Sequence, residues 1–396
     1  MGKGIAKILS GLLVFGMVAG LVPAVPGGTV NAKATEINGQ NATAEPHTHC
    51  VCGTGNLSVE RHTHKEETWT GISKLSDINR EGNYYLTQDV TLTSAWTCQR
   101  NVNLCLNGHS ITRTAKEYYD QNGNNAVIII KNNVDFTLTD CKGTGTITHK
   151  QGVSGEGVYN DGRFFMYNGI IFGNNGGVKN PGMFFMYGGT ITSNTANNGG
   201  EVDNAGTFTM DGGTITSNTA NNGGGVYNDN AGRFIMYGGT ITGNKAEQTY
   251  GTEYGGGVYN QGTFNMYGGE ITNNTATVGG GGVFNKGTFT MSGGEITSNS
   301  SESYGGGVCY SSSQLFKMSG TVNITENKVG TTPNNLYLWN GQQVSASGLT
   351  SGAEIGVTTQ IVPINDSSVP ITSDSVSVNC FFSDNSDYET AIDENS

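Results

Sequence analysis

The chain has 396 residues, of which 62 are glycine and 13% are charged, and its formal net charge is −12. Glycine is about twice as frequent, and charged residues about half as frequent, as in an average soluble protein. The acidic balance argues against nucleic acid or an anionic membrane as a partner, because phosphate groups are bound by basic patches and the sequence has none.

Residues 1–34 have the pattern of a secretory signal peptide. Lys3 and Lys7 precede an apolar run from Ile8 to Val25, and the Ala-Lys-Ala sequence at residues 32–34 offers a small-residue cleavage site. No later apolar run is long enough to span a bilayer. We therefore expect a product that is secreted or held at the cell surface, with no transmembrane segment after signal cleavage.

Residues 35–69 are polar, lack strand alternation and hold four of the six histidines. The motifs HTHCVCG and HTH supply six metal donors in eighteen residues, namely His47, His49, Cys50, Cys52, His62 and His64. Zinc takes four such ligands and could fold a segment too small to have a core, although this spacing is not a standard zinc motif. A structural zinc site, a redox element at Cys50 and Cys52, and a solvated linker all remain open. We expect no other cofactor.

Residues 70–150 contain strand patterns without a repeat. Alternating or β-branched runs cover residues 81–92, 101–112, 125–140 and 143–148. Cys98 and Cys105 lie close enough in sequence to form either a disulfide or two buried thiols.

Residues 151–330 repeat one phrase, GGVxNxGxFxMxGGxIxxN, whose valine recurs at intervals of 20 to 32 residues. Each repeat holds short alternating runs that end in Gly or Asn, the residues that tolerate tight corners, and no run suits a helix. A period of this size indicates stacked units. Because no hairpin turn separates like strands, each strand should pair in parallel with its counterpart one repeat later.

The sequence thus predicts an all-β, single-stranded parallel β-helix, a solenoid with three short strands per rung. Its inward columns should begin with Phe164, Met166 and Ile171, and a column of asparagines from Asn174 to Asn327 should form hydrogen bonds along the axis at one corner. Residues 70–150 then supply the N-terminal cap and first rungs, because an array of repeats exposes its core unless a distinct unit covers it.

The phrases GGVYN, GTFxMxGG and GGxITxN resemble the repeats of right-handed β-helices of the pectate lyase type, and more closely those of adhesin-like bacterial surface proteins and polymorphic outer membrane proteins. The resemblance covers about two thirds of the chain and implies a right-handed coil. It constrains function weakly, because such folds host lyases, hydrolases and pure binding proteins.

The C-terminal part lacks the Phe and Met columns. Residues 331–360 are predicted to form closing rungs. Residues 361–396 are richer in Ser, Asp and Val, and are predicted to be a C-terminal tail or the start of a further module.

A catalytic site would require charged side chains that converge on one outer face. The rung EVDNAGTFTMDGG provides weak candidates in Glu201, Asp203 and Asp211, where the two aspartates replace tyrosines. Neither aspartate is matched by a basic residue or histidine in the neighbouring repeats on this interpretation, so solvated surface charges are the preferred explanation. Whether the protein is an enzyme stays open, with a polysaccharide lyase or glycosidase as the alternative.

Outward tyrosines form two columns that are predicted to be exposed near one corner of the coil: Tyr159, Tyr227 and Tyr259 after the valine, and Tyr167, Tyr187, Tyr237 and Tyr267 after the methionine. Exposed rings can stack on sugars or on a protein partner, and they can equally stack on one another as a structural feature. We expect a non-catalytic, adhesin-like scaffold that contacts a glycan or a host or neighbour-cell surface protein through these rings.

Overall fold

The computed structural model describes residues 47–49, 51, 66–115, 125–196, 201–247, 254–314, 316–339, 341–364, 367–372, 374 and 378–391. The chain divides into Met1–Glu45 and Pro46–Ser396. The predicted signal peptide, as well as Cys50, Cys52, His62 and His64, lie outside the described residues. In the part of the chain that is described, no helix is long and apolar enough to cross a membrane.

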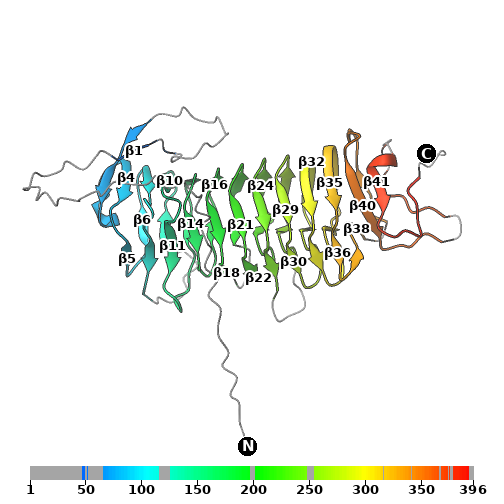
Figure 1. The fold of residues 1–396 in the computed structure, drawn as a ribbon, viewed down its shortest axis with the longest axis horizontal. Helices are drawn as coiled ribbons and strands as arrows, with labels where there is room; N and C mark the ends of the chain where they lie inside the picture. The colour runs from blue at the N-terminus through cyan, green and yellow to red at the C-terminus, as the bar shows by residue number, and fades with distance from the viewer. Residues whose placement is uncertain are drawn as a thin grey trace, which may run out of the picture. The chain divides into compact units, whose positions relative to one another are not determined.

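The unit Pro46–Ser396 is a right-handed parallel β-helix, as predicted (Figure 1). Successive strands along the chain belong to different faces of the coil, and each pairs in parallel with the corresponding strand of the next rung. The register joins like positions, for example Val178 with Val202 and Val226. The sequence period therefore becomes the rung period.

Three strands form each central rung. The first strands are β12 (Val158–Asn160), β15 (Val178–Asn180), β19 (Val202–Asn204), β23 (Val226–Asn228), β27 (Val258–Asn260), β31 (Val283–Asn285) and β34 (Val308–Tyr310). The second strands are β13 (Arg163–Met166), β16 (Met183–Met186), β20 (Thr207–Met210), β24 (Arg233–Met236) and β28 (Thr263–Met266). The third strands are β14 (Ile170–Phe172), β17 (Thr190–Thr192), β21 (Thr214–Thr216), β25 (Thr240–Thr242) and β29 (Glu270–Thr272). In β32 (Thr288–Thr297) and β35 (Phe316–Thr325) the second and third strands run together.

A short fourth pairing, which the sequence pattern did not reveal, follows the third strand. It consists of β18 (Thr195–Ala196), β22 (Thr219–Ala220), β26 (Lys245–Ala246), β30 (Thr275–Ala276), β33 (Ser300–Ser301), β36 (Lys328–Val329) and β37 (Thr332–Pro333). Its alanines are buried. Two-residue strands are too short to show a period in the sequence.

The first rungs lie between residues 70 and 149. They contain β3 (Thr70–Ile72), β4 (Gly82–Leu86), β5 (Val90–Leu92), β6 (Trp96–Cys98), β7 (Val102–Cys105), β8 (Ile111–Arg113), β9 (Ile128–Ile130), β10 (Asp135–Thr139) and β11 (Thr146–His149). A short antiparallel pair, β1 (Thr48–His49) and β2 (Glu67–Thr68), precedes them. The 3-10 helix η1 (Leu75–Asp77) covers the end of the coil, with Leu75 and Ile78 in the hydrophobic core.

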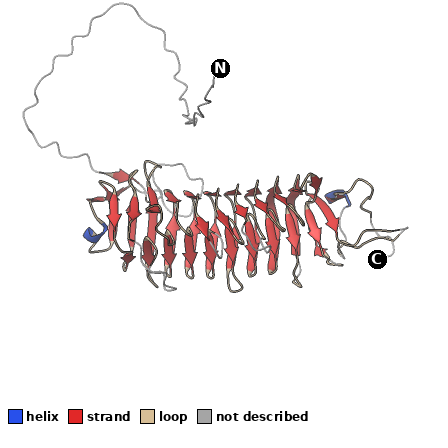
Figure 2. Cartoon of the chain, turned by 90° about the horizontal axis from the view of Figure 1, so that it is seen from below, coloured by secondary structure: helices blue, strands red, loops and turns tan. Residues whose placement is uncertain are grey.

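The last rungs close the other end. They contain β38 (Leu336–Leu338), β39 (Val344–Ser345) and β40 (Glu354–Thr359), and β41 (Phe381–Ser383) pairs in parallel with β40. A second 3-10 helix, η2 (Val378–Cys380), leads into β41, and Figure 2 shows the two short helices at opposite ends of the coil. Within the predicted tail, Cys380 and Phe381 belong to the core, so this segment includes a terminal strand.

The inward columns form the core as predicted. The side chains of the Phe, Met and Ile columns are fully buried, and successive Phe rings from Phe164 to Phe316 stack with centroids 4.4 to 4.9 Å apart. Rung spacing near 4.8 Å suits offset ring stacking. The Gly-Gly pair that separates the second and third strands makes a corner in which the second glycine has positive φ, such as +85° at Gly239.

Two ladders of buried asparagines run along the axis. In the predicted ladder, Asn194 Nδ2 donates to Asn218 Oδ1 at 3.2 Å, and the same pattern continues to Asn327 and Asn335. A second ladder joins the asparagines that end the first strands, as between Asn180 and Asn204 at 2.7 Å. The side-chain amides donate hydrogen bonds to asparagines of neighbouring rungs. They also donate to backbone carbonyl groups, such as those of Thr207 and Ile171, and so provide these groups with partners.

Candidate functional site

The second-strand column comprises the residues that directly follow each second strand: Tyr167, Tyr187, Asp211, Tyr237 and Tyr267. Because each follows an inward methionine, its side chain points outward. Tyr167 stacks on Tyr187 with centroids 4.9 Å apart, and Tyr237 stacks on Tyr267 at 5.1 Å. Tyr237 and Tyr267 are 43% and 47% exposed, whereas Tyr167 and Tyr187 are half-buried, so the accessible part of this aromatic column is at Tyr237 and Tyr267.

Further apolar side chains widen this surface on the same strands. Phe165 and Phe185 point outward between inward Phe and Met residues, and their rings stack at 5.1 Å. Met183, at the start of β16, is also exposed. The sequence interpretation did not single out these three residues, although strand alternation places them on the outer face. The outer face of β13 and β16 is therefore more apolar than the rest of its sheet.

The first-strand column comprises the central residues of the first strands: Tyr159, Lys179, Asp203, Tyr227, Tyr259, Phe284, Cys309 and, in β38, Tyr337. The prediction that its rings are exposed is wrong at Tyr259, which is only 5% exposed. Tyr259, Phe284, Cys309 and Tyr337 form a second hydrophobic cluster, against which Tyr227, Tyr254, Tyr304 and Trp339 pack. The Lys286 ammonium lies 5.8 Å from the Tyr259 ring centroid. Most of this column is thus a structural layer.

Asp203 has a basic neighbour, contrary to the sequence interpretation. Lys179 of β15 is its direct register partner, and Tyr227 is its partner on the other side. Burial raises the pKa of Asp203 to about 6; Lys179 opposes this shift, while Asp229 and Glu156 reinforce it. Burial raises the pKa of Tyr227 to about 12, with smaller contributions from Tyr259, Asp229 and Asp203. A cation, a carboxyl group and a phenol therefore lie on three successive rungs.

Glu201 does not lie on any outer face, so its candidacy for catalysis on a polymer is wrong. It takes the place that glycine holds in the other repeats, such as Gly177 and Gly225, and it is completely buried. Burial raises the pKa of its carboxyl group well above the ordinary value, and the backbone N–H groups of Gly177 and Ala196 oppose the shift only in part. Asp211, in contrast, lies in the second-strand column between Tyr187 and Tyr237.

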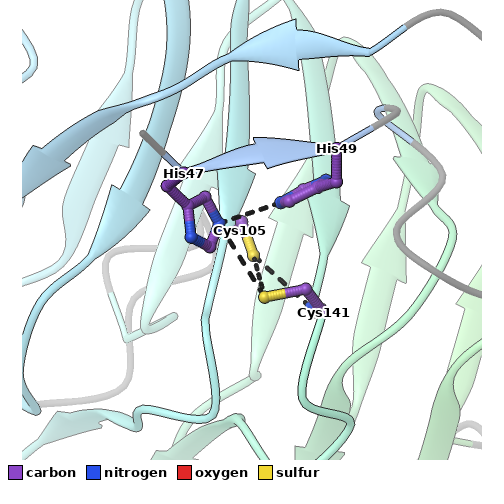
Figure 3. Close-up of side chains that lie close together, drawn as sticks. All are labelled: His47, His49, Cys105 and Cys141. Carbon is purple, nitrogen blue, oxygen red and sulfur yellow. Dashed lines mark hydrogen bonds between the residues drawn. The ribbon is translucent and has the colours of Figure 1, made fainter. Parts of the chain in front are cut away.

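Two of the predicted metal donors, His47 and His49, lie beside two cysteines that the prediction did not include (Figure 3). Their partners are Cys105 at the end of β7 and Cys141 just after β10, and the four donor atoms all lie within 4.8 Å of one another. Cys98 and Cys105 form no disulfide with each other; both are free and buried. Aligning Leu104 with Leu138, which are register partners, would have brought the two cysteines into proximity.

The sequence matches no family model, and comparisons with curated proteins and with solved structures find no similar protein. The β-helix architecture therefore stands on the structure itself, and the resemblance to adhesin-like proteins remains a prediction from the repeat motifs.

Proposed function

We propose that the protein is a secreted or cell-surface, non-catalytic β-helix scaffold that binds a glycan through the second-strand column. The observation that carries this proposal is the pair of exposed, stacked rings at Tyr237 and Tyr267. Large apolar rings left accessible on an outer face indicate an interaction surface. The covered rings of the first-strand column serve stability instead.

The chemistry of the surface favours a sugar over other ligands. Tyrosine offers a flat ring for stacking and a hydroxyl group for hydrogen bonds, the combination that a sugar ring requires. Asp211 adds a carboxyl group in the same column, between the two tyrosine pairs. A carboxylate accepts hydrogen bonds from vicinal hydroxyl groups. Because the column spans five successive rungs, it suits a ligand that also repeats, such as a linear polysaccharide.

A glycan array probed with the purified protein tests this proposal. We expect binding to at least one polysaccharide class, and at least a tenfold loss of affinity in the variant Tyr237→Ala/Tyr267→Ala. The matched control is Tyr159→Ala, which removes an outward tyrosine from the first-strand column on an earlier rung. Equal binding by the double variant and the parent would contradict the proposal. Retained binding to a protein ligand alone would assign the surface to a protein partner.

The enzyme alternative has one observation in its favour, the succession of Lys179, Asp203 and Tyr227. Asp203 with a pKa of about 6 could exchange a proton near neutral pH, and polysaccharide lyases and glycosidases depend on such groups. A broad polysaccharide panel assayed for reducing ends and for unsaturated products decides between the two. A product that is formed by the parent but not by Asp203→Asn would support the enzyme hypothesis over the scaffold hypothesis. A panel of polysaccharides left unchanged by the parent would exclude the enzyme hypothesis.

A further inference from the structure

The four donors His47, His49, Cys105 and Cys141 come from parts of the chain that are distant in sequence. His49 lies in β1 and His47 directly precedes it, whereas the cysteines belong to the first rungs of the coil (Figure 3). β7 and β10 are parallel neighbours, and Cys105 lies opposite Thr139. Cys141 stands two residues after Thr139 and is therefore near Cys105. The cluster therefore lies where the N-terminal segment meets the β-helix.

The spacing of the donor atoms is close to that of a tetrahedral metal site, with the two histidine nitrogens a few tenths of an ångström nearer to each other than zinc ligands are. His47 Nε2 and His49 Nε2 are 3.0 Å apart, the Sγ atoms of Cys105 and Cys141 are 3.5 Å apart, and Cys141 Sγ is 3.8 Å from His47 Nε2. Zinc bonds of about 2.0 Å to nitrogen and about 2.3 Å to sulfur require donor separations of roughly 3.3 to 3.8 Å in a tetrahedron. A disulfide would require the two sulfurs to be about 2.0 Å apart. The sulfurs are in contact without being bonded.

Surrounding groups hold the four donors in place. The His47 ring stacks on Tyr85 at 4.1 Å and the His49 ring stacks on the buried Trp69 at 4.4 Å. The Trp69 indole N–H donates to the backbone carbonyl of His49 at 3.0 Å. The backbone N–H of Cys141 donates to Cys105 Sγ at 3.4 Å, a bond that favours the thiolate. Such outer contacts are what orients the ligands of a metal site.

The protonation of the donors is compatible with metal binding. Burial, then the nearby His49 and Lys142, lowers the pKa of His47, a shift that favours the neutral ring a metal requires of a histidine ligand. Burial raises the pKa of Cys105. A divalent cation would reverse that effect, because a coordinating thiol is deprotonated. When bound to a divalent ion, two cysteine ligands would be thiolates and would balance its charge, which suits a buried site.

We propose that His47, His49, Cys105 and Cys141 bind one zinc ion that fastens the β1–β2 pair to the first rungs of the β-helix. Four protein ligands leave no coordination position for a substrate, so the site is structural. Thiolate and imidazole ligands in a tetrahedron favour zinc over magnesium, calcium or manganese. Zinc would hold in position the N-terminal segment whose Trp69 packs beside the coil.

Metal titration of the purified, chelator-treated protein is the first test. We expect one Co²⁺ per chain, with the visible absorption of tetrahedral cobalt and a thiolate-to-cobalt charge-transfer band in the near ultraviolet. Zn²⁺ should displace the cobalt and abolish both signals. An octahedral cobalt spectrum, or no spectral change, would overturn the proposal. Peptide mapping without reduction that shows Cys105 joined to Cys141 as a disulfide in the freshly purified protein would overturn it as well.

Paired variants separate this site from the alternative in the N-terminal segment. Cys105→Ser/Cys141→Ser and His47→Ala/His49→Ala should each lose the cobalt spectrum, while Cys50→Ser/Cys52→Ser should retain it. The matched single control is His109→Ala, which removes a histidine from outside the cluster. The opposite outcome, loss only in the Cys50/Cys52 variant, would place the metal elsewhere. The Ser substitutions could impair folding. Each variant must therefore give the same circular dichroism spectrum as the parent, and its central rungs must resist protease as well as those of the parent.

Hydrogen exchange tests whether zinc holds the β1–β2 pair against the first rungs. Zinc should slow amide exchange at least tenfold in Thr48–His49 and Glu67–Thr68 and leave the central rungs unchanged, because the ion joins only the N-terminal pair to the coil. Cobalt binding without this local protection would contradict the structural role.

Discussion

The two outward columns use the same residue type at the same rung spacing, yet one is exposed and the other is largely covered. Tyr267 is 47% exposed and Tyr259 is 5% exposed, although they belong to the same rung. A side chain that points outward from the coil is therefore not necessarily exposed to solvent. Its exposure depends on whether the segment that precedes the first strand of the rung covers it.

The covering residues lie just before the first strands. Tyr254 and Tyr304 each precede the valine of their rung by four residues, and parallel bridges link both to Gly279. These entering segments pass beside the first strands and place aromatic rings over them. Most second strands, in contrast, follow their first strands after a two-residue corner, which is Gln261 and Gly262 in this rung. A corner that short carries nothing that could cover the second-strand column.

The largest expected effect comes from truncating one ring of each column. Tyr259→Ala should lower the free energy of unfolding by about 3 kcal/mol, because it removes a buried aromatic side chain and leaves a cavity. Tyr267→Ala should lower it by about 1 kcal/mol or less, since an exposed ring loses only its stacking on Tyr237. Urea denaturation followed by circular dichroism measures both. Equal losses would show that the columns do not differ as described.

Glu201 sharpens the comparison from the inner side of the coil. In the described part of the chain neither carboxyl oxygen makes a hydrogen bond of normal geometry. Its pKa in the folded protein is raised above 4.5, so the protein loses stability as pH rises from that value through the folded pKa. Glu201→Gln should match the parent near pH 4 and exceed its stability by roughly 2 kcal/mol at pH 8. The comparison of urea midpoints at the two pH values measures this.

Glycine at this position should stabilise further. At the equivalent Gly225 an added Cβ would lie 2.7 Å from the Gly257 carbonyl oxygen, so the column favours a residue without a side chain. Glu201→Gly therefore removes both the buried carboxyl group and a crowded side chain. A loss of stability in both variants would mean that the carboxyl group has a partner that compensates its burial.

A pH effect of similar size is expected at Asp203, in the first-strand column. Its pKa rises from 3.8 to about 6 on folding, so it favours the folded state below pH 4 and this contribution disappears as pH rises through 6. Asp203→Asn should abolish that part of the pH dependence, which is of the order of 2 kcal/mol for a partly exposed group. Asp211→Asn, in the second-strand column, is the matched control. An unchanged profile in Asp203→Asn would assign the dependence to another group.

The smallest effect is spectroscopic. The pKa of Tyr227 is raised to about 12, first by burial and then by Tyr259, Asp229 and Asp203. Phenolate absorption in the parent should therefore include a late step near pH 12 that Tyr227→Phe lacks. Tyr267→Phe, in the other column, should leave that step in place. Loss of the late step in Tyr267→Phe would contradict the assignment.

Sequence periodicity was sufficient for the central part of the coil because its rungs, in residues 151–330, repeat one pattern. The columns that begin at Phe164, Met166 and Ile171, and the asparagine ladder, all lie where the repeat places them. A parallel solenoid converts equal positions in the repeat into neighbours in space, so one rule predicts many contacts.

The features that depend on irregular segments could not be predicted in this way. The covering of Tyr259 depends on the path of the segment that holds Tyr254, and the burial of Glu201 depends on a single departure from the glycine pattern. The cluster around His47 depends on the approach of β1 to Cys105 across a separation in sequence that no repeat encodes. Lys179 was predictable, since it stands one repeat before Asp203.

The asparagine ladder also has a direction. At every step the backbone N–H and Nδ2 of one asparagine donate to Oδ1 of the next towards the C-terminus, and the last of them, Asn335, donates its backbone N–H to Asp384 Oδ2 at 2.7 Å. The amide dipoles add along the axis, as they do in a helix, and the carboxyl group lies at their positive end. A carboxylate accepts hydrogen bonds but has none to pass on. Asp384 is therefore a terminator: it accepts the last donors of the ladder, those of the buried Asn335, which would otherwise be left without partners at the end of the coil.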